Sequence, residues 1–134
     1  KIYCKNVNND CLDISGGKVS GKYLEATNIN DKGISFGEES KGKIDSVNLK
    51  KNYLAIAVKD GSDLLIEEGN LTNNNFDVSV FKKKNEFGNA RLVLNKTNSS
   101  EPLKALIGEK NEFFSENILN FNKVNNNFIY NLFY

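Results

Sequence analysis

This 134-residue chain contains no histidine, no tryptophan and no methionine, and its single proline is Pro102. Without histidine it lacks the usual general base, the usual zinc ligand and any Ser–His or Cys–His nucleophile pair. No apolar run approaches the roughly 18 residues that a membrane span needs, so we do not expect membrane insertion. The missing initiator methionine predicts a processed chain or an excised segment.

The chain also lacks an excess of either charge. It has 18 Lys and Arg against 17 Asp and Glu, a net charge of +1. Such a balance creates no long-range field that would favour nucleic acid or anionic lipid as a partner. The composition, 39% hydrophobic, is that of a globular protein, and the length predicts one domain spanning residues 1–134.

The two cysteines, Cys4 and Cys11, are seven residues apart. In an oxidising compartment they could form a disulfide. Alternatively, they are two small buried apolar side chains on neighbouring strands. Their spacing fits no zinc pattern, and we predict no metal site from them.

What the sequence does have is a 22-residue repeat, clearest between Asn30 and Val80. Three columns of residues recur at this step: Asn8, Asn30, Asn52 and Asn74; Leu12, Ile34, Ile56 and Val78; Ile14, Phe36, Val58 and Val80. The two apolar columns lie two residues apart, which is the period of a β-strand with one buried face. Further matches at 22 precede them, from Ile2 to Leu24 and from Cys4 to Ala26.

Repeats of this length, built from short strands and turns, are typical of solenoids. We therefore predict an all-β, right-handed parallel β-helix with three walls, about 22 residues per coil and five to six coils. Residues 1–96 would form regular coils and residues 97–134 irregular C-terminal coils or a cap. Weak alternation predicts a strand at residues 118–121. The aromatic end, residues 128–134, has strong strand propensity and could finish the last coil, cap it or lie against a neighbouring chain.

The asparagine column has a structural explanation. Identical amides one rung apart can hydrogen-bond down a ladder, and asparagine tolerates the left-handed backbone of sharp turns. We therefore predict that Asn8, Asn30, Asn52 and Asn74 are scaffold residues and not ligand residues.

A family likeness is carried by three segments, which read DKGISFGEES from Asp31, AIAVKDGS from Ala55 and FKKKNEFGNARLVLNK from Phe81. They resemble the coil motifs of right-handed parallel β-helix proteins of the pectate-lyase and polygalacturonase-like architecture. They are most similar to secreted or surface β-helix segments of bacteria found beside spore-coat-protein-H-like kinase modules. The likeness covers roughly residues 8–96, and it implies an extracellular or cell-surface location.

The resemblance does not carry a catalytic site with it. A polygalacturonase-like site needs a Gly-His-Gly turn, and this chain has no histidine. A pectate-lyase-like site needs an arginine base beside an aspartate cluster, but Arg91 has no such cluster nearby in the sequence. We therefore predict no catalytic residue.

The best candidates for a binding site are Glu38, Lys59, Asp60 and Lys82, which stacking of the coils would gather along one edge. They could form a polar sugar-binding edge or a weak acid/base pair. Alternatively, they are cross-strand charge pairs that stabilise the turns. A calcium ion at Glu38, Glu39 and Asp60 is conceivable, although the adjacent lysines argue against it.

Two further sets of side chains are expected on the surface. One set faces outward at the 22-residue step and predicts a solvated sheet face: Asp13, Ser35, Ala57 and Ser79. The other could form a sugar-stacking platform wherever two of its rings share a face: Tyr3, Tyr23, Tyr53, Phe81 and Phe87.

Three functions fit these observations. The first is a non-catalytic extracellular module that binds or displays against polysaccharide or a cell-surface component. The second is a partial or degenerate polysaccharide lyase or epimerase. The third is a structural unit that self-assembles through open coil ends and the aromatic tail.

Overall fold

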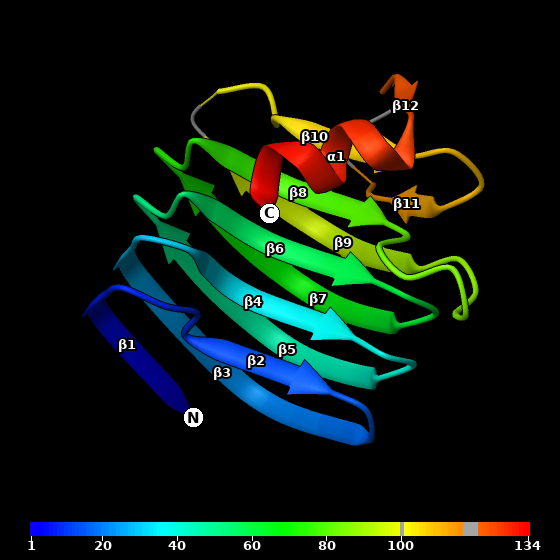
Figure 1. Cartoon of the computed structure of the whole chain (residues 1–134). Coiled ribbons are helices and arrows are strands. Elements are labelled where there is room, and N and C mark those ends of the chain that lie inside the picture. The colour runs from blue at the N-terminus through cyan, green and yellow to red at the C-terminus, as the bar shows by residue number, and fades with distance from the viewer. Residues whose placement is uncertain (100, 117–120) are drawn as a thin grey trace.

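The computed structural model describes residues 1–99, 101–116 and 121–134, and it forms a parallel β-solenoid of about five turns (Figure 1). Two stacks of parallel strands face each other across the core, with six strands in each sheet of the described chain. Sheet A contains, in spatial order, β1 (Ile2–Val7), β3 (Lys18–Ile29), β5 (Lys41–Lys50), β7 (Asp63–Thr72), β9 (Arg91–Ser99) and β11 (Glu112–Phe114). Sheet B contains, in the same direction, β2 (Leu12–Ser15), β4 (Lys32–Gly37), β6 (Leu54–Lys59), β8 (Phe76–Phe81), β10 (Ala105–Gly108) and β12 (Lys123–Val124).

The strand register confirms the repeat of about 22 residues. Ile34 pairs with Leu12 on one side and with Ile56 on the other, and Ile56 pairs with Val78. The match of Ile2 with Leu24 is also a pair of the ladder. The apolar columns of the sequence are therefore vertical rows of side chains inside the solenoid.

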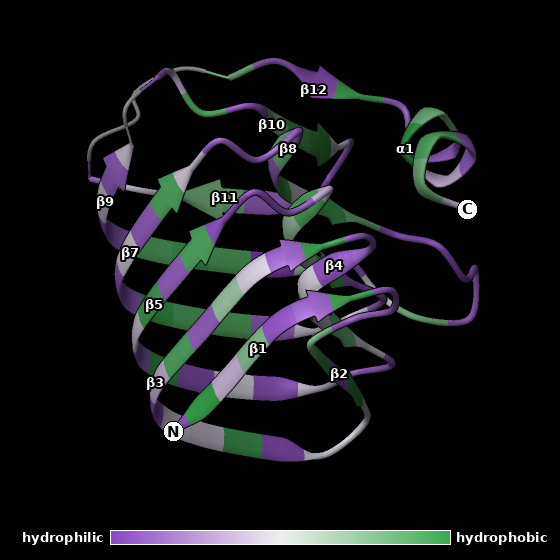
Figure 2. Ribbon diagram, turned by 90° about the vertical axis from the view of Figure 1, so that its left-hand side faces the viewer, coloured by the Kyte–Doolittle hydropathy of each residue, from purple (hydrophilic) through white to green (hydrophobic). Residues whose placement is uncertain are grey.

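The prediction of three walls is wrong, because the described strands form only two sheets. The strands of sheet A are long and curved (Figure 2), and each takes up residues that the sequence pattern had assigned to two walls. In β5 the buried residues Ile44 and Val47 are three apart, so Asp45 and Ser46 both lie off the core face. The pairing register omits Asp45, which places the change of direction within one continuous strand.

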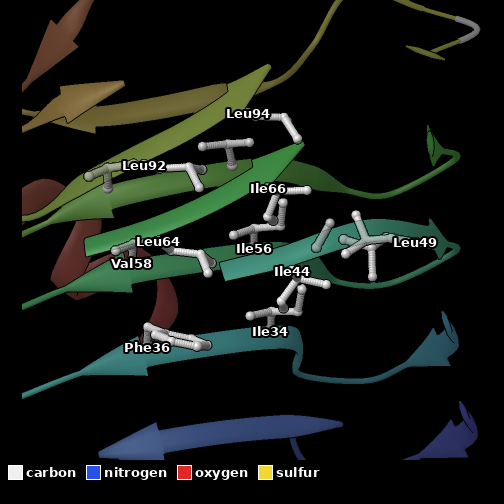
Figure 3. Close-up of a cluster of buried hydrophobic side chains, with 14 of the residues drawn as sticks. Ile34, Phe36, Ile44, Leu49, Ile56, Val58, Leu64, Ile66, Leu92 and Leu94 are labelled. Atoms are coloured by element: carbon white, nitrogen blue, oxygen red, sulfur yellow. The ribbon is translucent and has the colours of Figure 1, made fainter. Parts of the chain in front are cut away.

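Aliphatic side chains from both sheets fill the space between them (Figure 3). Ile34, Ile56 and Val58 of sheet B face Ile44, Leu64 and related residues of sheet A, and all are fully or almost fully buried. Because every turn contributes to the same continuous core, each turn is stabilised by its neighbours.

The repeat lengthens after the third full turn. Pairing advances by 22 residues from Lys41 to Asp63 but by 28 from Asp63 to Arg91. The extra residues form the long turn that the sequence predicts after Phe81. Pro102 follows in the connection between β9 and β10, outside any strand. Residues 118–120 of the weak predicted strand lie outside the described residues.

The asparagine column hydrogen-bonds between turns, but in two different ways. Near the open end, Asn30 Nδ2 donates to Asn8 Oδ1 at 2.8 Å, which is the predicted ladder. Further along, Asn74 Oδ1 accepts the backbone N–H of Asn52 at 2.9 Å, and Asn52 Oδ1 accepts that of Ile29 at 3.0 Å. The buried members therefore satisfy backbone groups of the adjoining turn.

The left-handed backbone belongs to neighbouring residues and not to this column. Asn6, Asn28, Lys51 and Asn73 have φ near 57° at successive turns, and Asn28 Nδ2 donates to Asn6 Oδ1 at 2.7 Å. Asparagine therefore occupies three of these four corners, where its short side chain tolerates positive φ.

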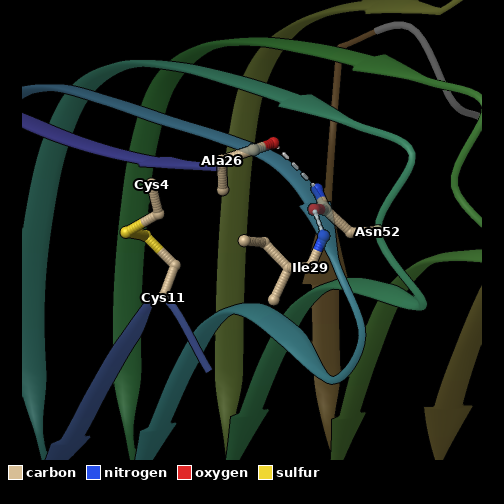
Figure 4. Close-up of a disulfide and its surroundings, with 5 residues drawn as sticks. All are labelled: Cys4, Cys11, Ala26, Ile29 and Asn52. Atoms are coloured by element: carbon tan, nitrogen blue, oxygen red, sulfur yellow. Dashed lines mark hydrogen bonds between the residues drawn. A yellow bond between two sulfur atoms is a disulfide. The ribbon is translucent and has the colours of Figure 1, made fainter. Parts of the chain in front are cut away.

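A disulfide joins Cys4 and Cys11, whose Cα atoms are 5.8 Å apart (Figure 4). It links β1 of sheet A to the residue just before β2 of sheet B. Both cysteines also pack against the core. The first of the two alternatives for this pair is therefore the one that the structure shows.

The aromatic end is a helix and not the predicted strand. Helix α1 (Asn126–Phe133) begins after Asn125, whose side-chain oxygen accepts the N–H of Asn127 at 2.7 Å. This N-cap satisfies a backbone donor that would otherwise lack a partner. Phe133 packs edge-on against Phe76 and Tyr53 of sheet B, with ring centroids 5.2 and 5.9 Å apart. Such tertiary contacts override a strand propensity that is weak on its own.

Helix α1 lies across the outer face of sheet B (Figure 1), so the prediction of a solvated face is wrong there. Ser35, Ala57 and Ser79 are fully buried. The Lys59 ammonium also lies over this face and donates to Ser35 Oγ at 2.8 Å. In the described part of the chain no helix is long and apolar enough to cross a membrane.

Candidate functional site

A cleft of about 240 Å³ lies beside the C-terminal end of α1, on the outer side of sheet B. We call it the mixed-charge cleft, because carboxylates and ammonium groups alternate around it. Its lining consists of Asp10, Asp13, Ser15, Asp31, Lys32, Gly37, Glu38, Lys59, Asp60, Lys83, Lys84 and Tyr134. These residues come from β2, β4 and β6, the turns around them, the long loop after β8 and the residue that follows α1.

The aromatic ring of Tyr134 is surrounded by three ammonium groups. The Nζ atoms of Lys83, Lys32 and Lys59 lie 4.0, 4.6 and 5.5 Å from its centroid. The ring also contacts Phe81, at a centroid distance of 6.2 Å. Burial and then the nearby aspartates raise the pKa of the Tyr134 hydroxyl, so it stays protonated and can donate a hydrogen bond at neutral pH.

Lys59 is held without a carboxylate partner among the described residues. Its only printed hydrogen bond goes to Ser35 Oγ. Burial lowers the pKa of the Lys59 ammonium, and the positive charge of Lys32 lowers it further, while Asp13 opposes the shift. Lys59 is therefore a desolvated cation whose hydrogen-bonding capacity is only partly used.

Lys32 is the paired cation of the site. Its Nζ lies 2.7 Å from Asp31 Oδ1 and 3.9 Å from Asp10 Oδ1. Asp10 also accepts the backbone N–H of Lys32 at 3.0 Å. Burial raises the pKa of Asp10 even though Lys32 opposes that shift. The arrangement fixes one charge pair at the edge of the cleft.

Asp60 organises the loop after β8. Its Oδ1 accepts the backbone N–H groups of Lys83 and Lys84 at 2.7 and 2.8 Å. Its Oδ2 is buried and has no hydrogen-bond partner among the described atoms. Asp60 therefore positions the backbone that presents the Lys83 ammonium to Tyr134.

Glu38 forms an ion pair with Lys84. The hydrogen bond from Lys84 lowers the pKa of Glu38, and the same bond raises the pKa of Lys84. Both side chains are substantially exposed, so the pair contributes little to stability. For this pair the structural interpretation, charge pairing between turns, describes the geometry.

Of the four residues predicted from the sequence, three line the cleft: Glu38, Lys59 and Asp60. Lys82 is not among the lining residues, and its backbone N–H donates to Asn126 Oδ1 at 2.8 Å, which ties the loop to α1. Sequence reasoning missed Tyr134, because residues 128–134 were interpreted as a strand. The signal that was available was the asparagine run before this segment, which supplies the helix cap Asn125.

The other predicted ligand sites are not assembled. No group of three or more Asp, Glu, Cys or His in the described residues could hold a metal ion, so the calcium interpretation has no such cluster behind it. Tyr3 and Tyr23 do share a face, with centroids 5.7 Å apart. Tyr53 instead packs on Phe133, and Phe81 is buried.

Comparison of the chain with protein-family models, with curated proteins and with solved structures found no match in any of the three. The solenoid fold therefore rests on the strand register itself.

Proposed function

We propose that this protein is a non-catalytic extracellular β-solenoid module that binds polysaccharide of a cell surface through the mixed-charge cleft. One observation carries the proposal. The cleft brings the incompletely hydrogen-bonded ammonium of Lys59 together with Lys83, Asp13 and the Tyr134 ring.

The chemistry of a sugar suits this set of groups. Each sugar hydroxyl both donates and accepts, so it can accept from an ammonium and donate to a carboxylate. A ligand carrying a single charge would be repelled by half of the lining, whereas a polyhydroxylated ligand uses both signs. The Tyr134 hydroxyl adds a donor, and the edge of its ring offers an apolar contact.

The proposal is tested by titrating the protein with oligosaccharides chosen from a glycan-array screen, including uronate oligomers. We expect Lys59→Met and Lys83→Ala each to weaken binding about tenfold, which corresponds to the loss of one charge-assisted hydrogen bond. The matched control is Lys50→Ala, an exposed lysine on sheet A. Equal affinity of all four proteins, or no glycan bound by any of them, would contradict the proposal.

The finer features of the family likeness belong to the same proposal. Right-handed winding is supported by the general rule that connections between parallel strands of one sheet are right-handed in about 98% of cases. The Cys4–Cys11 disulfide supports an oxidising, extracellular compartment.

A second candidate function is that of a polysaccharide lyase or epimerase, and the lowered pKa of Lys59 favours it. An amine that loses its proton more readily is a better general base, and Asp13 and the protonated Tyr134 hydroxyl lie in the same cleft. Incubation with uronate polymers separates the two candidates. Ultraviolet absorbance from unsaturated uronate, abolished in Lys59→Met, would favour the enzyme, and binding without turnover would favour the module.

The third alternative, self-assembly through the aromatic tail, loses its original motive. Phe133 and Tyr134 pack on sheet B of their own chain. They are therefore not available to another chain unless α1 detaches.

A further inference from the structure

At the open end of sheet A, half of one strand lacks a neighbour. Strand β3 pairs with β5 along most of its length, from Lys18 to Thr27. Its pairing with β1 begins only at Leu24. Residues 18–23 thus form an edge that has no strand beyond it in the described chain, and Figure 1 shows β1 covering only part of β3. Unpaired backbone groups on such an edge can hydrogen-bond to an added strand.

The core face of this edge has a hollow at Gly21. In the same row of the ladder the next turns carry Ile44, Ile66 and Leu94, all buried. A Cβ added at Gly21 would meet nothing within 4 Å. The missing side chain leaves an apolar hollow of about 100 Å³, lined in part by Leu12, Val19, Leu24 and Ile44. That volume is about three times the 30 Å³ share of one water molecule, which matches one branched aliphatic side chain.

The outer face of the same edge is basic. A groove of about 480 Å³ runs past Gly21 and is lined by Lys1, Lys22 and Lys43 against the single carboxylate of Asp45. The apolar hollow and the basic groove meet at Ser20 and Gly21, so they lie on the two faces of one vacant strand position.

We propose that residues 18–23 bind an extended peptide segment of a partner protein, which adds to sheet A as a strand. Successive side chains of a strand point to opposite faces. The peptide residue beside Gly21 therefore places an aliphatic side chain in the hollow. The residues on either side of it face the lysines of the groove and are acidic. The recognised pattern is acidic–aliphatic–acidic, a form of recognition by strand addition. This inference is independent of the mixed-charge cleft.

The test uses a capped seven-residue peptide with Asp-Ile-Glu at its centre, added to the isotopically labelled protein. We expect the backbone amide signals of residues 18–23 to shift and their hydrogen exchange to slow. Peptides with Asp-Gly-Glu or Lys-Ile-Lys at the centre should bind at least tenfold more weakly. The charge-reversed protein Lys22→Glu/Lys43→Glu should instead prefer the Lys-Ile-Lys peptide.

Filling the hollow provides the decisive variant. Gly21→Ile should fold, because the equivalent positions of later turns carry Ile or Leu, and it should lose the Asp-Ile-Glu peptide. The matched control is Gly88→Ile, since a Cβ at Gly88 also meets nothing within 4 Å but lies in the loop after β8. Equal binding of the isoleucine and glycine peptides, or unimpaired binding by Gly21→Ile, would overturn the proposal. Dimerisation of the peptide-free protein with protection of the same amides would assign the edge to a second copy and would also overturn it.

Discussion

Gly42 lies directly against the ring of Phe36, so closely that a Cβ at Gly42 would be 2.4 Å from Phe36 Cε2. No rotamer change can relieve this contact cheaply, because Phe36 is fully buried in the core. We expect Gly42→Ala to lower the free energy of unfolding by about 1–3 kcal/mol through overpacking. Urea unfolding measures the change, with Gly88→Ala as a control that should change stability by less than about 1 kcal/mol. Equal stability of the two variants would show that the solenoid adapts to the added methyl group.

The turn after β4 contains a residue that glycine would suit better. Glu39 has φ of 61°, and at the steps of 22 residues before and after it the chain has Gly17 and Gly61, also at positive φ. A side chain in this conformation costs about 1–2 kcal/mol. We expect Glu39→Gly to raise the urea midpoint, while Glu39→Ala, which keeps a Cβ, should not. A lower midpoint for Glu39→Gly would mean that the glutamate side chain contributes more than the strain costs.

The lowered pKa of Lys59 predicts a pH dependence of stability. Below its ordinary pKa of about 10.4, the unfolded state binds this proton more readily than the folded state does. The free energy of unfolding should therefore rise with pH as the folded Lys59 loses its proton, and this penalty is greatest at lower pH. The groups that face Lys59 are Lys32, Lys83, Asp10 and Asp13.

Lys59→Met should remove that rise and should be the more stable protein at neutral pH. Unfolding curves between about pH 7 and 9.5 test this, before tyrosines begin to ionise in the unfolded state near pH 10. The raised pKa of Tyr134 acts in the opposite direction above that value, because the folded state then holds the proton longer. Parallel pH curves for the two proteins would contradict the prediction.

Helix α1 should depend on Phe133 for its position. Phe133 makes two edge-on ring contacts with sheet B, each of which contributes about 0.5–1.5 kcal/mol beyond area burial. We expect Phe133→Ala to detach the helix and to speed hydrogen exchange at Ser35, Ala57 and Ser79. Phe128→Ala is the matched control, since Phe128 is on the same helix and 55% exposed. Slow exchange at the sheet in both variants would show that other contacts hold α1.

The disulfide should contribute to stability by closing an eight-residue loop. The chain-entropy estimate for such a loop is about 2.5 kcal/mol. We therefore expect the double variant Cys4→Ser/Cys11→Ser to unfold at a lower urea concentration than the oxidised protein. A reductant should destabilise the parent protein and have no effect on the variant. Insensitivity of the parent to reductant would argue that the thiols are free in solution.

Much of the scaffold was predictable from local pattern. Residues such as Ile34, Ile56 and Val78 recur at one step because parallel strands repeat the same environment every turn, so spacing alone predicts their register. The number of sheets was not predictable in this way. A change of direction within β5 needs only one additional residue off the core face, and the sequence contains no glycine or proline at Asp45 to mark it.

The candidate site divides along the same line. The 22-residue repeat placed Glu38, Lys59 and Asp60 near one another, because their spacing follows the stacking of the turns. The sequence alone thus determined the parallel solenoid, its apolar rows and one edge of the cleft. Only the tertiary structure brought Tyr134 among Lys32, Lys59 and Lys83 and buried Ser35, because those contacts join segments about 50 to 100 residues apart through packing that no local period encodes.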